Sequence, residues 1–382
     1  MGKIQIRPLR KKCLLIIFFY FIILEISCSK NNETYKAEIK NGIKIIENLR
    51  PKWGDESRIT LEFVRKIGGL DTQDENYMFY MPLDLVQDTE GNKYILDRGE
   101  FRIRKFDSNW KYIKRFVRNG QGPGEISNTS GLAINAHSNI YLFDQGNMRV
   151  QILDSDGIYI NSIRADHQSF GGSVQSTGRV VLTARSFHSR SGEIIDSKNP
   201  TILAIVDLDG KIIERFVESE IFDESFLMYS ASHVSFDLDV DDNIYVTFWF
   251  QNRIEKYSPD GKLIFFSKRP LKYEIKQRVV VNNDIREPIM TYISNDIRID
   301  GKERIWVTTY DKQPESQGSR GATLKNRKWL KFEIYDKDGV LLGEIPAPIE
   351  FHKKRIYGNT LFLIDPYFEA CIYEYKIVDN EE

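Results

Sequence analysis

Short stretches of alternating apolar and polar residues recur along the chain, and turn residues bound them. A period of two residues is typical of β-strands. Six copies share a stretch centred on an aromatic residue or valine, and they begin at residues 92, 139, 179, 243, 304 and 360: NKYILD, NIYLFD, RVVLTA, NIYVTF, RIWVTT and TLFLID. Their spacing of 40 to 64 residues leaves room for one four-stranded antiparallel sheet per copy. The pattern therefore predicts six repeated sheets.

Each copy is followed by a second strand pattern, which often ends in an Asp–Gly turn, a hairpin signal. A further short strand follows in the first five units, but the sixth unit ends before one can form. An unpaired strand pattern, ITLEFVRKIGG (59–69), precedes the first unit. Because an open sheet edge invites aggregation, we expect this strand to complete the last sheet. The predicted fold class is all-β: a single six-bladed β-propeller of four-stranded antiparallel blades, closed by strand 59–69.

The repeat also resembles a known family. The segment IYLFDQGNMRVQILDSDG (140–157) resembles the unit of NHL-type six-bladed β-propellers, and GQGPGE (120–125) resembles the glycine-rich turn between blades in bacterial lipoprotein propellers of that type. The resemblance covers roughly 59–378 and implies the propeller fold. It does not name a function, because propellers include both enzymes and binding proteins.

The N-terminus has the pattern of an export signal. Basic residues precede an apolar run from Cys13 to Leu24, which is too short to span a bilayer core of about 30 Å. The segment LEISC ending at Cys28 resembles the lipobox of bacterial lipoproteins, with Glu25 where leucine is usual, and implies a lipid on Cys28. A membrane-spanning anchor is the alternative. We expect a lipid-anchored location in the bacterial cell envelope, at the periplasmic or surface face of the outer membrane.

The domain boundaries follow from these patterns. We predict a signal peptide (1–27), a polar tether (28–57), the propeller (58–378) and a short tail (379–382). The 54 Lys and Arg nearly balance the 55 Asp and Glu, which argues against a nucleic-acid partner. We expect a monomer whose partners are the membrane, through the lipid, and an unidentified protein or small molecule.

Functional side chains in a propeller are expected where the innermost strands surround the central channel. Counting ten residues back from the centre of each signature gives one position per blade: Asp84, Gly131, Gly171, Ser235, Asp296 and His352. With the neighbouring Asn295, the polar members form the candidate ligand-binding set of Asp84, Ser235, Asn295, Asp296 and His352. Such a set could hold a cation, a sugar or a small polar ligand, and a solvated channel lining is the alternative.

Other polar clusters are better explained as structure. The acids before Asn243 fit a strand and turn better than a calcium site, and the strong zinc signatures are absent. Arginines at the start of third strands, such as Arg149 after Asp144, are expected to pair with the preceding aspartate and hold the blade together. Two long insertions, 186–200 and 311–329, are candidates for contacting a partner.

We therefore expect a binding protein without catalytic residues or cofactor. The first alternative is a calcium-dependent hydrolase or lyase similar to the lactonases and gluconolactonases. That resemblance implies Asp84, Asp296 and Asn295 as calcium ligands, but the glutamate of those enzymes has no clear counterpart here. The second alternative is a structural spacer in the envelope.

Overall fold

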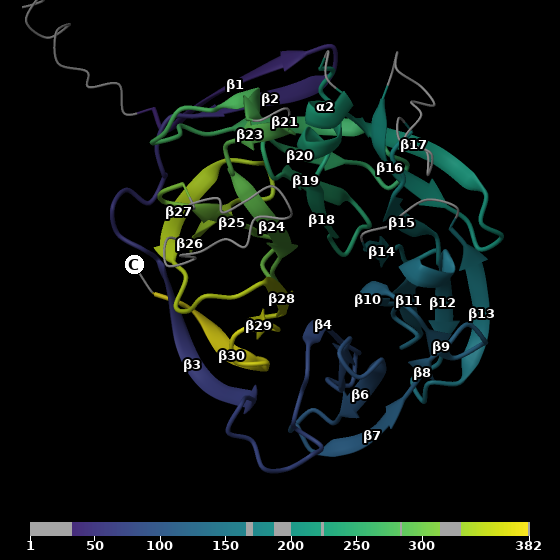
Figure 1. Ribbon diagram of the computed structural model, residues 1–382. Helices are drawn as coiled ribbons and strands as arrows, with labels where there is room; N and C mark the ends of the chain where they lie inside the picture. Colours follow the sequence, from purple (N-terminus) through teal and green to yellow (C-terminus); the bar gives the residue numbers. More distant parts are fainter. Residues whose placement is uncertain are drawn as a thin grey trace, which may run out of the picture. The chain divides into compact units, whose positions relative to one another are not determined.

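The computed structural model describes residues 33–165, 171–186, 200–222, 225–282, 285–313 and 330–380. In the unit that begins at Tyr35, six sheets, each with four antiparallel strands, are arranged as blades around a central axis (Figure 1). The described helices are the 3-10 turn η1 (Gln145–Asn147) and the short helix α2 (Ser225–Ala231). None of the described helices is long and apolar enough to cross a membrane.

The blades follow one another in chain order, and each runs from an inner strand to an outer strand. Blade 1 contains β4 (Pro82–Gln87), β5 (Lys93–Asp97), β6 (Arg102–Phe106) and β7 (Tyr112–Phe116). Blade 2 contains β10 (Thr129–Ile134), β11 (Ile140–Asp144), β12 (Arg149–Leu153) and β13 (Tyr159–Arg164). Blade 3 contains β14 (Gly172–Val174), β15 (Val180–Thr183), β16 (Thr201–Val206) and β17 (Ile212–Glu218).

The second half of the ring repeats this order. Blade 4 contains β18 (Val234–Leu238), β19 (Ile244–Phe248), β20 (Ile254–Tyr257) and β21 (Leu263–Lys268). Blade 5 contains β24 (Ser294–Ile299), β25 (Ile305–Tyr310), β26 (Leu330–Tyr335) and β27 (Leu341–Pro346). Blade 6 contains β28 (Lys353–Tyr357), β29 (Thr360–Asp365), β30 (Cys371–Asp379) and β3 (Ile59–Gly68). Two further pairs lie outside the blades: β8 (Arg118–Asn119) runs parallel to β9 (Glu125–Ile126), and β22 (Gln277–Asn282) forms an antiparallel pair with β23 (Ile285–Met290).

The ring closes through the N-terminal strand, as the repeat pattern predicts. Strand β3 pairs antiparallel with β30, from Ile59 opposite Asp379 to Gly68 opposite Cys371. The pairing supplies the fourth strand that the sixth repeat lacks. The predicted fold class is confirmed.

The central aromatic residue of the repeat has a recurring structural role. Tyr94 and Tyr245 donate hydrogen bonds of 3.0 and 3.1 Å from their hydroxyls to Asp88 and Asp239, six residues earlier. In blade 5 the indole Nε1 of Trp306 donates to Asp300 at 2.8 Å. Each ring is fully buried, so its polar end needs such a partner. The signature thus combines core packing with a bond that fixes the preceding turn.

Part of the range expected as a polar tether is folded. Strands β1 (Tyr35–Lys40) and β2 (Ile43–Asn48) form a hairpin, and β2 adds parallel to β21 at the outer edge of blade 4. The physical reason is the apolar pair Ile45–Ile46, because the Ile46 side chain is buried in the core between blades 4 and 5. Blade 4 is thereby extended to six strands.

From this hairpin the chain continues along the outer strands of blades 4 and 5. Asn48 donates through Nδ2 to Ser267 Oγ at 3.0 Å and accepts from the Leu341 N–H at 2.8 Å, so it connects the two blades. Trp53 packs so closely on Gly343 that a Cβ there would lie 2.2 Å from the indole. We name residues 35–58 the N-terminal belt, which leads into β3 of blade 6.

Smaller predictions are decided by local contacts. The expected pair forms in blade 2, where Arg149 Nε lies 3.1 Å from Asp144. It does not form in blade 1, because Arg102 donates to the Val117 carbonyl instead.

The carboxylate of Glu125 accepts the N–H groups of two residues of GQGPGE, which forms a turn. Residues 1–32, including Cys28, and most of the insertions 186–200 and 311–329 lie outside the described residues.

Candidate functional site

Five of the six ring positions are structurally equivalent. In four blades the residue pairs with the one two places after the centre of the signature: Asp84 with Leu96, Gly131 with Phe143, Ser235 with Thr247, and Asp296 with Thr308. The His352 N–H donates to the Ile364 carbonyl in the corresponding register. The count of ten residues therefore identifies equivalent positions in these five blades. At Asp84, Gly131 and Asp296 a β-bulge precedes the residue, a device that re-aims side chains.

The Asp84 carboxylate is enclosed by cations. Its side chain is fully buried and receives two hydrogen bonds from Arg355, 2.8 Å from Nε and 2.7 Å from Nη2. Lys353 Nζ lies 2.6 Å away, and the Leu85 and Leu132 N–H groups donate at 2.9 Å. Burial by itself raises the pKa of this carboxyl, but Arg355 and Lys353 lower the pKa well below its usual value. Asp84 is therefore ionised and fully paired.

Asp296 has a similar environment on the other side of β28. It is 5% exposed, with Arg298 Nη2 at 3.1 Å and Lys354 Nζ at 3.7 Å. The Ile297 and Lys354 N–H groups also donate to its carboxylate. Burial raises the pKa of Asp296, and the two cations outweigh that effect, so the net shift is downward. This carboxylate too is occupied by protein groups.

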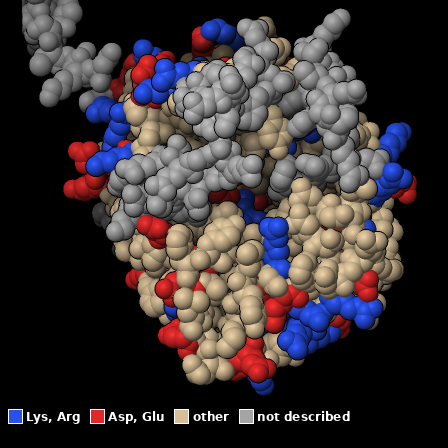
Figure 2. Space-filling model, in the orientation of Figure 1, with Lys and Arg blue, Asp and Glu red and all other residues tan. Residues whose placement is uncertain are grey.

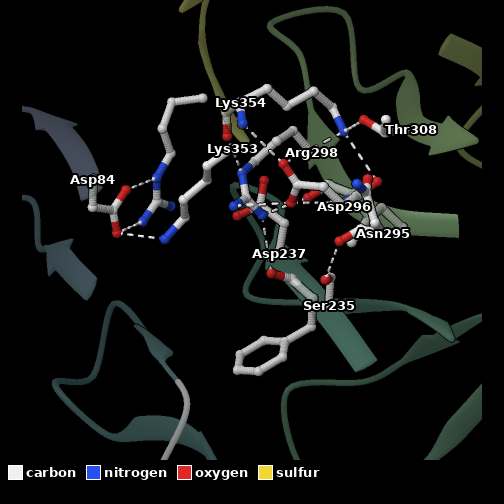
Figure 3. A network of polar contacts seen from close by, with 12 residues as sticks. Asp84, Ser235, Asp237, Asn295, Asp296, Arg298, Thr308, Lys353 and Lys354 are labelled. Atoms are coloured by element: carbon white, nitrogen blue, oxygen red, sulfur yellow. Dashed lines mark hydrogen bonds and ion pairs between the residues drawn. The ribbon is translucent and has the colours of Figure 1, made fainter. Parts of the chain in front are cut away.

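Strand β28 supplies three consecutive basic residues that join the two acids (Figure 3). Because side chains alternate along a strand, Lys353 and Arg355 point to Asp84 whereas Lys354 points to Asp296. Lys354 is fully buried, and its Nζ donates to Thr308 Oγ1 at 2.8 Å and the Asp296 carbonyl at 3.0 Å. The prediction of site residues missed this triplet. The signal was available, since KKR is a basic run on an expected inner strand.

The remaining predicted residues divide into two groups. Ser235 Oγ donates to the Asn295 carbonyl at 2.7 Å and accepts from Trp249 Nε1 at 3.1 Å, so Ser235 and Asn295 lie beside Asp296. The imidazole of His352 instead packs edge-on against Tyr367, with ring centroids 5.1 Å apart. A third carboxylate, Asp237, accepts the Ile299 N–H at 3.0 Å. Burial raises the pKa of Asp237.

The opposite side of the ring carries glycines. A Cβ on Gly131 would lie 2.8 Å from Asp84 Oδ2 and 3.3 Å from Lys353 Nζ, so the contact requires glycine. At Gly171, whose φ is +120°, no atom of the described residues lies within 4 Å of a Cβ position. Charged side chains thus come from blades 1, 4, 5 and 6, whereas blades 2 and 3 contribute glycines at this level. Figure 2 shows basic atoms at the centre of this face.

The charges of the network do not suit a metal cation. Both oxygens of Asp84 already accept hydrogen bonds from Arg355, and Lys353 and Lys354 lie where a cation would be repelled. The described parts of the chain contain no group of three or more His, Cys, Asp or Glu side chains that could hold a metal. The implied calcium ligands Asp84 and Asp296 therefore do not fit calcium.

The basic side chains outnumber the acids in this network. Four Lys and Arg side chains face three carboxylates: Arg298, Lys353, Lys354 and Arg355 against Asp84, Asp237 and Asp296. Among the described residues, Asp84 is the one acceptor that Lys353 Nζ reaches, and an ammonium has three N–H donors. The Lys353 side chain is 22% exposed, whereas that of Asp84 is 0% exposed. The arrangement can offer a solvent-accessible cation to an anion.

Solved structures share this fold. A protein of the DUF4221 family from Bacteroides vulgatus is 12% identical with a TM-score of 0.57, and the match covers 84% of this chain and 99% of that chain. A protein from Bacteroides fragilis, named as exported, is 12% identical with a TM-score of 0.58, covering 88% and 100%. At this identity the likeness shows the fold alone.

A more distant neighbour is an enzyme. A catalytically inactive variant of virginiamycin B lyase from Staphylococcus aureus is 12% identical with a TM-score of 0.49, and the match covers 84% of this chain and 100% of that chain. A likeness this distant says nothing about the activity of this chain. No curated protein matches the chain. Residues 56–264, more than half of the sequence, match the model of a family described as six-bladed β-propellers. The chain therefore belongs to this family of six-bladed β-propellers.

Proposed function

We propose that the chain is a lipid-anchored, extracytoplasmic binding protein of the NHL type, without catalytic activity, whose channel binds a small anionic ligand at Lys353. The observation that carries the proposal is the surplus cation beside Asp84. Arg355 alone neutralises this carboxylate through two hydrogen bonds, so the ammonium of Lys353 adds a positive charge. A partly buried cation gains most from an anion that also accepts its remaining N–H groups.

The ring geometry supports an anion of small size. Gly131 places no side chain beside Lys353 Nζ, and no atom of the described residues lies within 4 Å of the Cβ position of Gly171, so a ligand could approach the channel from the side of blade 3. A carboxylate on a small polar molecule is the ligand class that fits this combination.

The lipid anchor rests on the N-terminal sequence. Basic residues, a short apolar run and Cys28 follow one another in the order of a bacterial lipoprotein signal. Because the whole chain is nearly neutral, it lacks the basic surplus that binding to nucleic acid requires. We therefore propose that the propeller samples small anions in the cell envelope while Cys28 holds it at a membrane.

Calorimetric titration of the mature lipidated protein in detergent tests the ligand class. Glucuronate and glucose are a matched pair of probes, since they differ in the carboxylate. We expect glucuronate to bind and glucose to release no heat above dilution. The variant Lys353→Met should lose glucuronate binding, whereas Lys211→Met, which removes an exposed lysine on blade 3, should retain it. Equal binding of both sugars, or binding that survives Lys353→Met, would contradict the proposal.

A calcium-dependent hydrolase is the competing function. It requires Asp84 and Asp296 to release their cationic partners, which the geometry disfavours. Elemental analysis of the purified protein for calcium separates the two functions. A stoichiometric calcium ion that is lost in Asp296→Ala, together with lactonase activity, would favour the enzyme.

A further inference from the structure

The outer strand of the belt hairpin is unusually open for a folded edge. All six residues of β1 are exposed, and among the described strands it pairs with β2 alone. Tyr35 and Ile39 lie on one face of β1 at a spacing of four residues, and Ile39 is 76% exposed. Tyr35 and Ile39 thus present apolar side chains to solvent at the rim of blade 4.

The charge of this region differs from that of the whole chain. Residues 29–52 contain six basic and three acidic residues, a net charge of +3, whereas the whole chain carries −1. The basic members are Lys30, Lys36, Lys40, Lys44, Arg50 and Lys52. Within the hairpin itself three lysines and two glutamates leave a net charge of +1, and Lys40 pairs with Glu38 at 2.6 Å. The rest of the surplus comes from the residues just before and after the hairpin. A basic surplus beside exposed apolar side chains favours an anionic lipid surface.

The length of chain before β1 limits where this hairpin can lie. Six residues separate Cys28 from Tyr35. Even fully extended, these seven steps span roughly 24 Å. A folded unit of this size has a radius of gyration of about 20 Å, so its opposite rim is considerably farther from the attachment point than the tether can reach.

We infer that the β1–β2 rim of blade 4 rests against an anionic lipid surface, so that the propeller stands on its edge at the membrane. The inference rests on the lipid anchor of the proposed function. In Figure 1 the hairpin β1–β2 lies at the top of the ring and β7 of blade 1 at the bottom. Edge-on attachment leaves both mouths of the channel open to solvent, which suits a protein that collects small anions.

Fluorescence quenching in vesicles tests this orientation. The mature lipidated protein is reconstituted into vesicles of phosphatidylethanolamine and phosphatidylglycerol that include a lipid with a quencher on its headgroup. A bimane label is attached to Ile39→Cys on β1 or, as matched control, to Ile113→Cys on β7, which is 46% exposed. The native Cys371 does not compete, because burial raises the pKa of its thiol to about 11 and its side chain is inaccessible.

We expect several-fold stronger quenching of the label at position 39 than of the label at position 113. Equal quenching at both positions, or stronger quenching at 113, would overturn the inference while leaving the anchor intact. Protein that does not float with the vesicles would overturn the anchor itself and this inference with it. Neither result depends on whether the channel binds an anion.

Discussion

Arg355 binds Asp84 through two nearly parallel hydrogen bonds, of 2.8 Å and 2.7 Å, across 271 residues of sequence. The pair joins β28, the inner strand of blade 6, to β4, the inner strand of blade 1. The carboxylate of Asp84 is fully buried, so it needs a cationic partner for the fold to be stable. Lys353 Nζ contacts the same carboxylate from its more exposed side.

Removing this arginine should destabilise the whole ring. We expect Arg355→Met to lower the free energy of unfolding by about 3 kcal/mol or more, since loss of one partner leaves a buried charge short of compensation. Chemical denaturation measures the change. Arg115→Met, which removes an exposed arginine from β7, is the control and should change stability by less than about 0.5 kcal/mol. Similar stabilities for the two variants would show that Asp84 does not depend on Arg355.

Anion binding should weaken in alkaline solution. Burial lowers the pKa of Lys353 to about 8, against the opposing influence of Asp84. Binding that needs the ammonium is complete below this pKa and is lost as the pH rises through it. Glucuronate titrations across this pH range should therefore show affinity falling, even though the carboxylate of the ligand stays ionised. Affinity that is constant to pH 10 would exclude Lys353 as the binding cation.

The belt should contribute measurably to stability. Asn48 is 2% exposed and makes hydrogen bonds to both blade 4 and blade 5. Replacing it with alanine leaves buried backbone groups unpaired, so we expect Asn48→Ala to cost about 2 kcal/mol. Asn161→Ala on the exposed side of β13 serves as the control. If Asn48→Ala and wild type melt at the same temperature, the N-terminal belt does not contribute to the stability of the propeller through Asn48.

Closure of the ring through β3 can be tested by deletion. Without residues 59–69, β30 becomes an open edge, and its nine residues can pair with other chains. We expect the truncated protein to aggregate on size-exclusion chromatography. A soluble, cooperatively melting product would contradict the closure.

The repeat could be predicted from the sequence because its signals are local. The position of each inner-strand residue follows from a fixed count of ten, and the register around Asp84, Ser235 and Asp296 agrees with it. Strand 59–69 could be assigned since the last blade lacked one strand and the segment had the strand period. These inferences need only periodicity and the number of strands per blade.

The site depended on contacts that periodicity does not encode. The sequence presents Asp84 as a cation ligand, but in the structure Arg355 and Lys353, more than 260 residues away, hydrogen-bond to its carboxylate. The side chain of His352 occupies a ring position but turns to Tyr367, a choice of rotamer set by local packing. The parallel pairing of β2 with β21 likewise joins segments some 220 residues apart.

A crystal structure of the protein grown with glucuronate tests the central claim most directly. The account predicts a carboxylate within hydrogen-bond distance of Lys353 Nζ, with the Asp84–Arg355 pair unchanged. A carboxylate bound elsewhere with the channel empty, or a metal ion coordinated by Asp84 and Asp296, would contradict it.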